Sequence, residues 1–185
     1  MAIRNTTLEY GTLAKALHWL VAIALIMLVY LGLAQADLPR GPERDEIRFI
    51  HGSIAMAVFF LMSIRISWRL MNDVPAHPDG MRAWQRVSAS IVHWGLYAAV
   101  FVQLVSGSMT VATGGKALPF FGLFSVPLPV AQSRDNHELW EEVHEFAWRI
   151  VAVLVVIHVL GALFNHFVAK NDVLRRMTVG IKQTR

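Results

Sequence analysis

The sequence contains no cysteine and little charge. Without cysteine the chain can form no disulfide, no thiolate metal site and no thioether link to a haem. Charged residues make up 16% of the chain and hydrophobic residues 55%, whereas average proteins carry about 25% charge. The apolar residues are also gathered in long blocks. These features indicate an integral membrane protein, and we interpret the uneven net charge of +4 as membrane topology rather than nucleic-acid binding.

Four segments are long and apolar enough to cross a bilayer as helices, which takes roughly 20 residues. They cover residues of about 13–36, 47–70, 86–112 and 139–169. All four should be helical, because lipid offers no hydrogen-bond partner to open backbone groups. Loops rich in proline, glycine or charge connect them, and we expect the phenylalanines of the third loop to lie against the membrane interface. The sequence predicts an all-α fold, a membrane four-helix bundle that forms one domain over residues 1–185.

Basic residues predict the orientation of the bundle. The N-terminal flank, the second loop and the C-terminal tail carry Arg4, Lys15, Arg65, Arg69, Arg82, Arg86, Lys170, Arg175, Arg176, Lys182 and Arg185. The first loop region carries Arg40, Arg44 and Arg48, and the third carries only Lys116 and Arg134. Cytoplasmic loops are the ones enriched in lysine and arginine. We therefore expect both termini and the second loop in the cytoplasm.

Two histidines mark the ends of the apolar part of the fourth segment. His144 and His158 are fourteen residues apart, so a helix separates them by about 21 Å along its axis and by about 40° around it. One face of this helix therefore presents an imidazole at each side of the membrane. Two other segments supply histidines at matching depths, with His51 opposite His144 and His18 opposite His158.

Facing histidines are how a helical bundle holds a b-type haem, each giving one axial nitrogen to the iron. A site near each membrane surface lets the haem propionates reach water while the macrocycle fills the apolar core. The sequence predicts two haem b groups, one held by His51 and His144 and the other by His18 and His158. Small residues near the histidines should let the ring approach the backbone, and the candidates are Gly52, Ser53, Gly95 and Gly161.

The ligand set at the inner side stays open at this point, because His93 lies at a depth close to that of His18 and His158. His93 could replace either one as a ligand. It could also bond a propionate or line a quinone pocket, and we prefer these roles. The remaining histidines are expected in loops or at the interface, apart from a candidate donor role near the outer haem for His137; they are His77, His137 and His166.

Several motifs together give the chain a resemblance to a known family. They are ALHWL (16–20), IHGSI (50–54), HWGLY (93–97), FFGLFSVPLP (120–129), KNDVLRRM (170–177), and the block from VHEFAW to VIHVLGALFNHF in the fourth segment. In order and spacing they resemble the prokaryotic cytochrome b561 family, which is similar to the b-type cytochrome subunits of nickel-iron hydrogenases. The resemblance implies a multi-pass protein of the bacterial inner membrane, with two haem b groups, the ligand pairs given above and electron exchange with ubiquinone.

Some members of the family are similar to superoxide oxidases, which implies an oxidoreductase that takes electrons from periplasmic superoxide and reduces ubiquinone. Positive groups on the outer loops should then draw in the superoxide anion, and the candidates are Arg44, Arg48, Lys116 and Arg134. Near the inner haem, Lys15, Arg69 and His93 are candidate quinone contacts. Arg149 departs from the family pattern as a charge inside the fourth helix. It is a candidate to bind a propionate or to tune the haem potential, and the alternative is that its side chain extends to the outer surface.

Two other functions fit the same residues. The chain could be a membrane anchor that relays electrons for a partner dehydrogenase, hydrogenase or other periplasmic redox protein. It could also be a haem-free transporter that uses the histidines for proton coupling. Short loops leave little surface for a large partner, and transporters of this size often contain internal repeats, which are not visible here. Membrane lipid is an expected partner, and nucleic acid is not.

Overall fold

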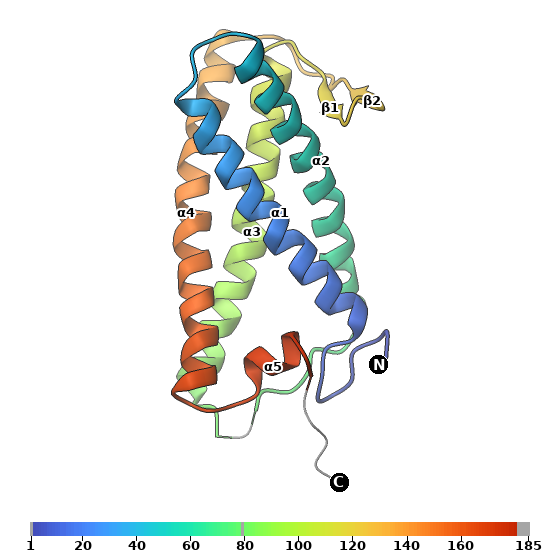
Figure 1. Ribbon diagram of the computed structural model, residues 1–185, viewed down its shortest axis with the longest axis vertical. Coiled ribbons are helices and arrows are strands. Elements are labelled where there is room, and N and C mark those ends of the chain that lie inside the picture. Colours follow the sequence, from blue (N-terminus) through green and yellow to red (C-terminus); the bar gives the residue numbers. More distant parts are fainter. Residues whose placement is uncertain (1, 79, 181–185) are drawn as a thin grey trace.

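The computed structural model describes residues 2–78 and 80–180; Lys182 and Arg185 of the basic tail lie outside them. Within these residues four long helices run side by side: α1 (Thr12–Ala36), α2 (Pro42–Met71), α3 (Ala83–Thr113) and α4 (Arg134–Phe167) (Figure 1). Each is long and apolar enough to cross a membrane. A short helix α5 (Val173–Met177) follows α4, and strands β1 (Leu118–Phe120) and β2 (Phe124–Val126) form a hairpin between α3 and α4. The predicted all-α membrane bundle is confirmed.

Two of the helices begin several residues before their apolar stretches. Pro42 stands in the first turn of α2 with Glu43 and Asp45; proline has the helical φ already, and acidic side chains interact favourably with the positive end of the helix dipole. At α4, Ser133 caps the helix by accepting a hydrogen bond from the Asn136 backbone N–H at 3.3 Å. Polar first turns therefore extend both helices beyond the segments that apolar length predicts.

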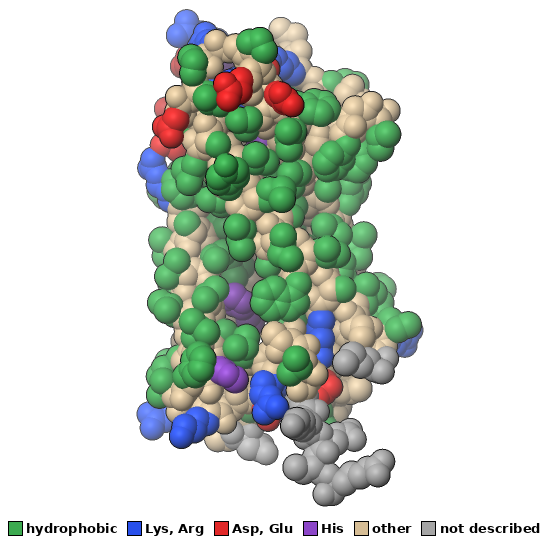
Figure 2. Space-filling model, viewed as in Figure 1, with side chains coloured by type: hydrophobic (Ala, Val, Ile, Leu, Met, Phe, Trp, Pro, Cys, Tyr) green, Lys and Arg blue, Asp and Glu red, His purple; other side chains and the backbone are tan. Residues whose placement is uncertain are grey.

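The two ends of the bundle differ in their elements and in their charge. We call the end with the N-terminal segment, the α2–α3 connection and α5 the terminal end, and the end with the α1–α2 connection, the hairpin and the start of α4 the hairpin end (Figure 1). In the space-filling view an apolar band separates acidic side chains at the hairpin end from a mainly basic terminal end (Figure 2). A band of this kind matches the hydrocarbon layer of a bilayer.

The helices pack as two pairs. α1 lies along α2 and α3 lies along α4, whereas the pairs meet mainly through α2 and α3. The core cluster between them consists of Val21, Leu28, Val58, Met62, Tyr97, Val100, Leu104 and Val151. Val58, Val100 and Val151 each lie seven residues from a histidine of their own helix, which returns nearly to the same helix face. These valines form an apolar layer between histidines near one end and histidines near the other.

The third loop, predicted to lie against the interface, contains a β-hairpin that packs on α2. Phe120 pairs with Phe124 across the strands, and their rings stack at 4.8 Å between centroids. Gly122 in the turn has φ +74°, which glycine adopts without strain. The fully buried Ser53 hydroxyl accepts a hydrogen bond from the Phe121 backbone N–H at 3.0 Å. One side chain of α2 therefore holds the hairpin at its turn.

Candidate functional site

At the hairpin end, His144 of α4 is oriented by hydrogen bonds to α3. Its Nδ1–H donates to the backbone carbonyl of Gln103 at 3.0 Å, and the buried Ser106 hydroxyl lies 3.2 Å from the same nitrogen. This arrangement leaves the lone pair on Nε2, which accepts a hydrogen bond from the Gln103 side-chain amide at 3.0 Å. A histidine held through Nδ1–H to a carbonyl presents Nε2 as a metal ligand.

His51 of α2 lies near His144, and each of these two imidazoles lies against a glycine. A Cβ added to Gly107 of α3 would come within 2.7 Å of His144 Cε1, and one added to Gly32 of α1 would lie 3.6 Å from His51 Cε1. The Nδ1 of His51 is buried and makes no hydrogen bond within the described part of the chain. Two imidazoles, an unsatisfied nitrogen and two glycine surfaces are compatible with a flat, metal-centred cofactor.

The glycines that lie against imidazoles are not the small residues that the sequence suggested. Gly52 faces Pro119 of the hairpin, at 3.0 Å from an added Cβ, and Gly95 faces Leu154. Nothing lies within 4 Å of a Cβ added to Gly161. Gly52 and Ser53 therefore serve hairpin packing and Gly95 serves helix packing, so the expectation was wrong for these three, while the role of Gly161 stays a prediction.

At the terminal end, three histidines from three helices come together. The ring centroids of His18 and His158 are 6.0 Å apart, and those of His93 and His158 are 5.3 Å apart. A metal ion bound between two imidazoles needs bonds of about 2 Å on each side, which the wider spacing accommodates better. The spacing of His18 and His158 is therefore the one closer to what two such bonds need, with His93 beside them, and the ligand pair stays a prediction.

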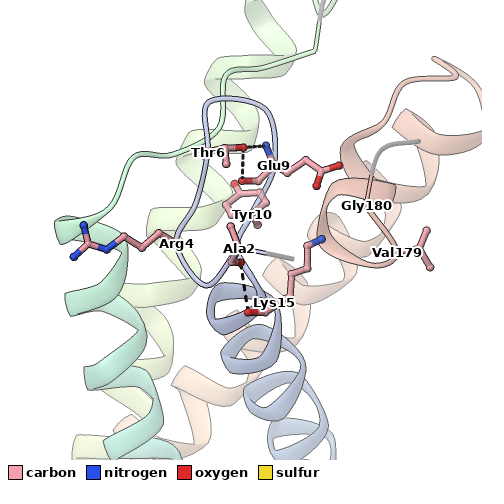
Figure 3. Close-up of a pocket in the computed structure, with 10 residues that line it drawn as sticks. Ala2, Arg4, Thr6, Glu9, Tyr10, Lys15, Val179 and Gly180 are labelled. Atoms are coloured by element: carbon pink, nitrogen blue, oxygen red, sulfur yellow. Dashed lines mark hydrogen bonds between the residues drawn. The ribbon is translucent and has the colours of Figure 1, made fainter. Parts of the chain in front are cut away.

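Two predicted quinone contacts lie in different places. Arg69 of α2 places its guanidinium 5.5 Å from the ring centroid of Trp94 and 5.8 Å from that of Tyr97, close to the histidine cluster. Lys15 instead lines a cavity of about 210 Å³ at the terminal end, with Arg4 and Tyr10 among its other walls (Figure 3). No histidine lines this cavity.

The other predicted residues are not members of the two histidine groups. Arg149 forms an ion pair with Glu145 on the exposed surface of α4, about 140° around the helix from His144. His137 donates its Nδ1–H to the Thr110 carbonyl at 2.9 Å. His77 is exposed in the α2–α3 connection, and the ring of His166 packs edge-on against Phe167.

On each of the four helices, a residue of one histidine group lies fourteen positions from a residue of the other group. Fourteen residues separate His144 from His158, and the same interval separates three further pairs: His18 and Gly32, His51 and Arg65, His93 and Gly107. We call Gly32, His51, Gly107 and His144 the hairpin-end layer, and His18, Arg65, His93 and His158 the terminal-end layer. Gly32, Gly107 and Arg65 were missed as site residues, and this shared interval is the sequence signal that could have found them. No such spacing in the sequence points to Gln103 or Ser106 as partners of His144.

Paired histidines inside four membrane helices are typical of a membrane cytochrome. Residues 9–180 match the family described as prokaryotic cytochrome b561, and the chain belongs to this family. It is 31% identical over 185 residues to cytochrome b561 homolog 2 of Escherichia coli (strain K12), covering 96% of this chain and 95% of that protein. It is 27% identical over 163 residues to cytochrome b561 homolog 1 of the same organism, covering 87% and 92% of the two chains.

A further relative is the probable superoxide oxidase CybB of Yersinia pestis, which is 23% identical over 169 residues, covering 91% of this chain and 95% of that protein. Family and fold together make the chain a multi-pass protein of the bacterial inner membrane and a b-type cytochrome in electron transfer. Bound haem b supplies one-electron redox chemistry. The donor set, the unsatisfied His51 nitrogen and the glycines beside the imidazoles fit this group.

Proposed function

We propose that the chain carries electrons across the inner membrane through two haem b sites, from a periplasmic donor at the hairpin end to ubiquinone at the terminal end. His51 and His144 hold the first haem, and His18 and His158 hold the second. The observation that carries this proposal is the pair of layers, fourteen residues apart on every helix, with buried valines between them. With two histidines supplied to each haem, the iron would have no open position, which disfavours oxygen binding.

Superoxide is the donor that we propose, because a relative is named a probable superoxide oxidase and because of Arg44. This residue precedes His51 by seven positions on the same face of α2, and its buried Nε has no hydrogen-bond partner within the described residues. Of the other outer cations, Arg48 binds Gln35 and Arg134 pairs with Glu138. A cation close to the site raises the local concentration of an anionic substrate.

Ubiquinone is the acceptor that we propose at the terminal end. Two superoxide anions give up one electron each and become two molecules of oxygen, while one ubiquinone takes both electrons and two protons to become ubiquinol. Trp94 and Tyr97 supply apolar walls, and Arg69 and His93 supply polar groups near them, as quinone pockets require. His93 is the titratable group placed to deliver a proton.

A second donor class is favoured by the acidic start of α4. Its exposed carboxylates are Asp135, Glu138, Glu141, Glu142 and Glu145. Acidic patches steer basic protein partners and repel small anions. The second candidate function is therefore an electron relay for a basic periplasmic redox protein.

The experiment that tests the proposal begins with the visible spectrum and haem content of the purified protein. Two low-spin b haems per chain are expected, and a colourless protein grown with ample haem would favour proton-coupled transport instead. Superoxide is then supplied to proteoliposomes that contain ubiquinone. We expect ubiquinol to form, more slowly in Arg44→Gln and at the normal rate in Arg134→Gln, whose side chain is already paired. No turnover in a fully haem-loaded protein would favour the relay function.

A further inference from the structure

Arg65 occupies on α2 the place that histidines occupy on the other three helices of the terminal-end layer. It follows His51 by fourteen residues, as His158 follows His144. Its half-buried guanidinium donates to His18 Nδ1 at 3.1 Å and to the Ala14 carbonyl at 3.3 Å. Its central carbon lies 5.9 Å from the Tyr97 ring centroid. Arg65 thus connects three helices around the histidine cluster.

None of these partners carries a negative charge. Within the described residues the ion pairs are Arg134 with Glu138 and Arg149 with Glu145, both on other surfaces of the molecule. A permanent cation inside a membrane bundle is costly without an anion, and a desolvated guanidinium interacts most strongly with a carboxylate or phosphate. Arg65 is therefore placed to bind an anion that enters this layer.

The hydrogen bond from Arg65 to His18 is incompatible with metal binding through the other imidazole nitrogen. A guanidinium has donors only, so His18 Nδ1 must accept, and a neutral His18 then carries its proton on Nε2. Ligation through Nε2 requires the opposite tautomer, with the proton on Nδ1. When His18 becomes a ligand, Arg65 must therefore exchange this bond for another acceptor.

We propose that Arg65 binds a propionate carboxylate of the haem at the terminal-end layer and raises the reduction potential of that haem. The inference rests on the proposed function, which places a haem between His18 and His158. The carboxylate arrives with the cofactor and suits the two-pronged geometry of a guanidinium. A fixed positive charge in a medium of low dielectric favours the reduced, less positive iron. Electron flow toward the terminal end is thereby favoured.

The test is a spectroscopic redox titration of Arg65→Gln in the His144→Ala background, where only the terminal-end haem is expected to remain. We expect the equilibrium constant for reduction of this haem to fall at least tenfold, which is about 59 mV for one electron. Arg65→Lys keeps the charge and should stay closer to the unsubstituted potential. Arg69→Gln is the matched control, since it removes an equal charge one turn away that does not touch His18, and its shift should be less than half as large.

Each outcome decides the role of Arg65. A normal potential in haem-loaded Arg65→Gln, or an equal shift in Arg69→Gln, would overturn the proposal, since a purely structural contact does not move the potential. If Arg65→Gln does not retain haem, the measurement on Arg65→Lys decides the question. A reduction potential near the unsubstituted value supports the charge effect, and a tenfold lower equilibrium constant for reduction overturns it. The His144→Ala protein without any haem would instead contradict the ligand pair in the proposed function.

Discussion

At the scale of single residues, Gly107 determines how closely the His144 imidazole lies against α3. A Cβ at this position would meet His144 Cε1 at 2.7 Å and Nδ1 at 3.0 Å, which is closer than real contacts allow. We expect Gly107→Ala to displace the imidazole from the Gln103 carbonyl and to lower the haem content from two per chain toward one. Haem quantification on the purified protein measures this loss.

The control for this prediction is Gly161→Ala on α4. Nothing lies within 4 Å of a Cβ added there, and alanine is the better helix former by about 1 kcal/mol. The control should keep the haem of the hairpin-end layer, because Gly161 lies toward the other end of α4. Equal haem content in both variants would show that the His144 position does not depend on the glycine surface.

The sequence predicts which histidines share a depth, but it does not predict their hydrogen bonds. His18, His93 and His158 come together as their depths imply, because helix rise fixes depth to within a turn. The partners of His144 depend on how α3 is rotated about its axis, which places Gln103 and Ser106 beside the imidazole. Rotation is set by packing between helices, and a single sequence does not specify it. The ligand pairs themselves stay a prediction.

At the scale of elements, Ser53 connects the hairpin to α2. Ser53→Ala would leave the Phe121 backbone N–H without its acceptor, and a buried unsatisfied group costs about 1–3 kcal/mol. We expect the hairpin to open more often, while the helix content stays unchanged. Faster backbone hydrogen exchange over residues 118–126, measured by mass spectrometry, checks this prediction.

Ser63→Ala is the matched substitution on the same helix. The Ser63 hydroxyl donates only to the Phe59 carbonyl one turn earlier, just as Ser53 donates to Phe49, but it has no bond to the hairpin. Hydrogen exchange of the hairpin should be normal in this variant. Similar acceleration in both variants would mean that loss of a helix-internal serine bond, rather than the hairpin contact, causes the effect.

Apolar length predicted the existence of the four helices, but it did not predict the hairpin or the polar helix starts. The hairpin has strands of three residues, Leu118–Phe120 and Phe124–Val126, and strands so short are marginal by themselves. They are held by Phe120 stacked on Phe124 and by the contact with Ser53. Such contacts join positions far apart in the sequence, so periodicity within the loop gave no sign of them.

At the scale of the whole molecule, the packing into two helix pairs explains where the histidines lie. Most helix contacts are made within the two pairs, between α1 and α2 and between α3 and α4. The imidazoles of His18 and His158, in contrast, approach each other from different pairs. A flat group bound between the pairs would add the contacts that they lack. The same arrangement puts one histidine layer near each end of the bundle and the apolar valine layer between them.

The direction of electron flow depends on the orientation of the bundle, which the absence of cysteine makes easy to measure. A single cysteine can be placed at Lys116, exposed at the hairpin end, or at His77, exposed at the terminal end. The bias of lysine and arginine toward the terminal end predicts that this end is cytoplasmic. A maleimide that does not cross the inner membrane should therefore label Lys116→Cys in cells with a permeabilised outer membrane.

His77→Cys should be labelled by the same reagent only after the inner membrane is broken, and the cysteine-free parent protein should not be labelled at all. The opposite pattern would invert the bundle. The layer of His51 and His144 would then face the cytoplasm, where ubiquinone would have to be reduced at the acidic end of the molecule. Arg44 could no longer attract a periplasmic anion, and the donor that we propose would have no access to its site.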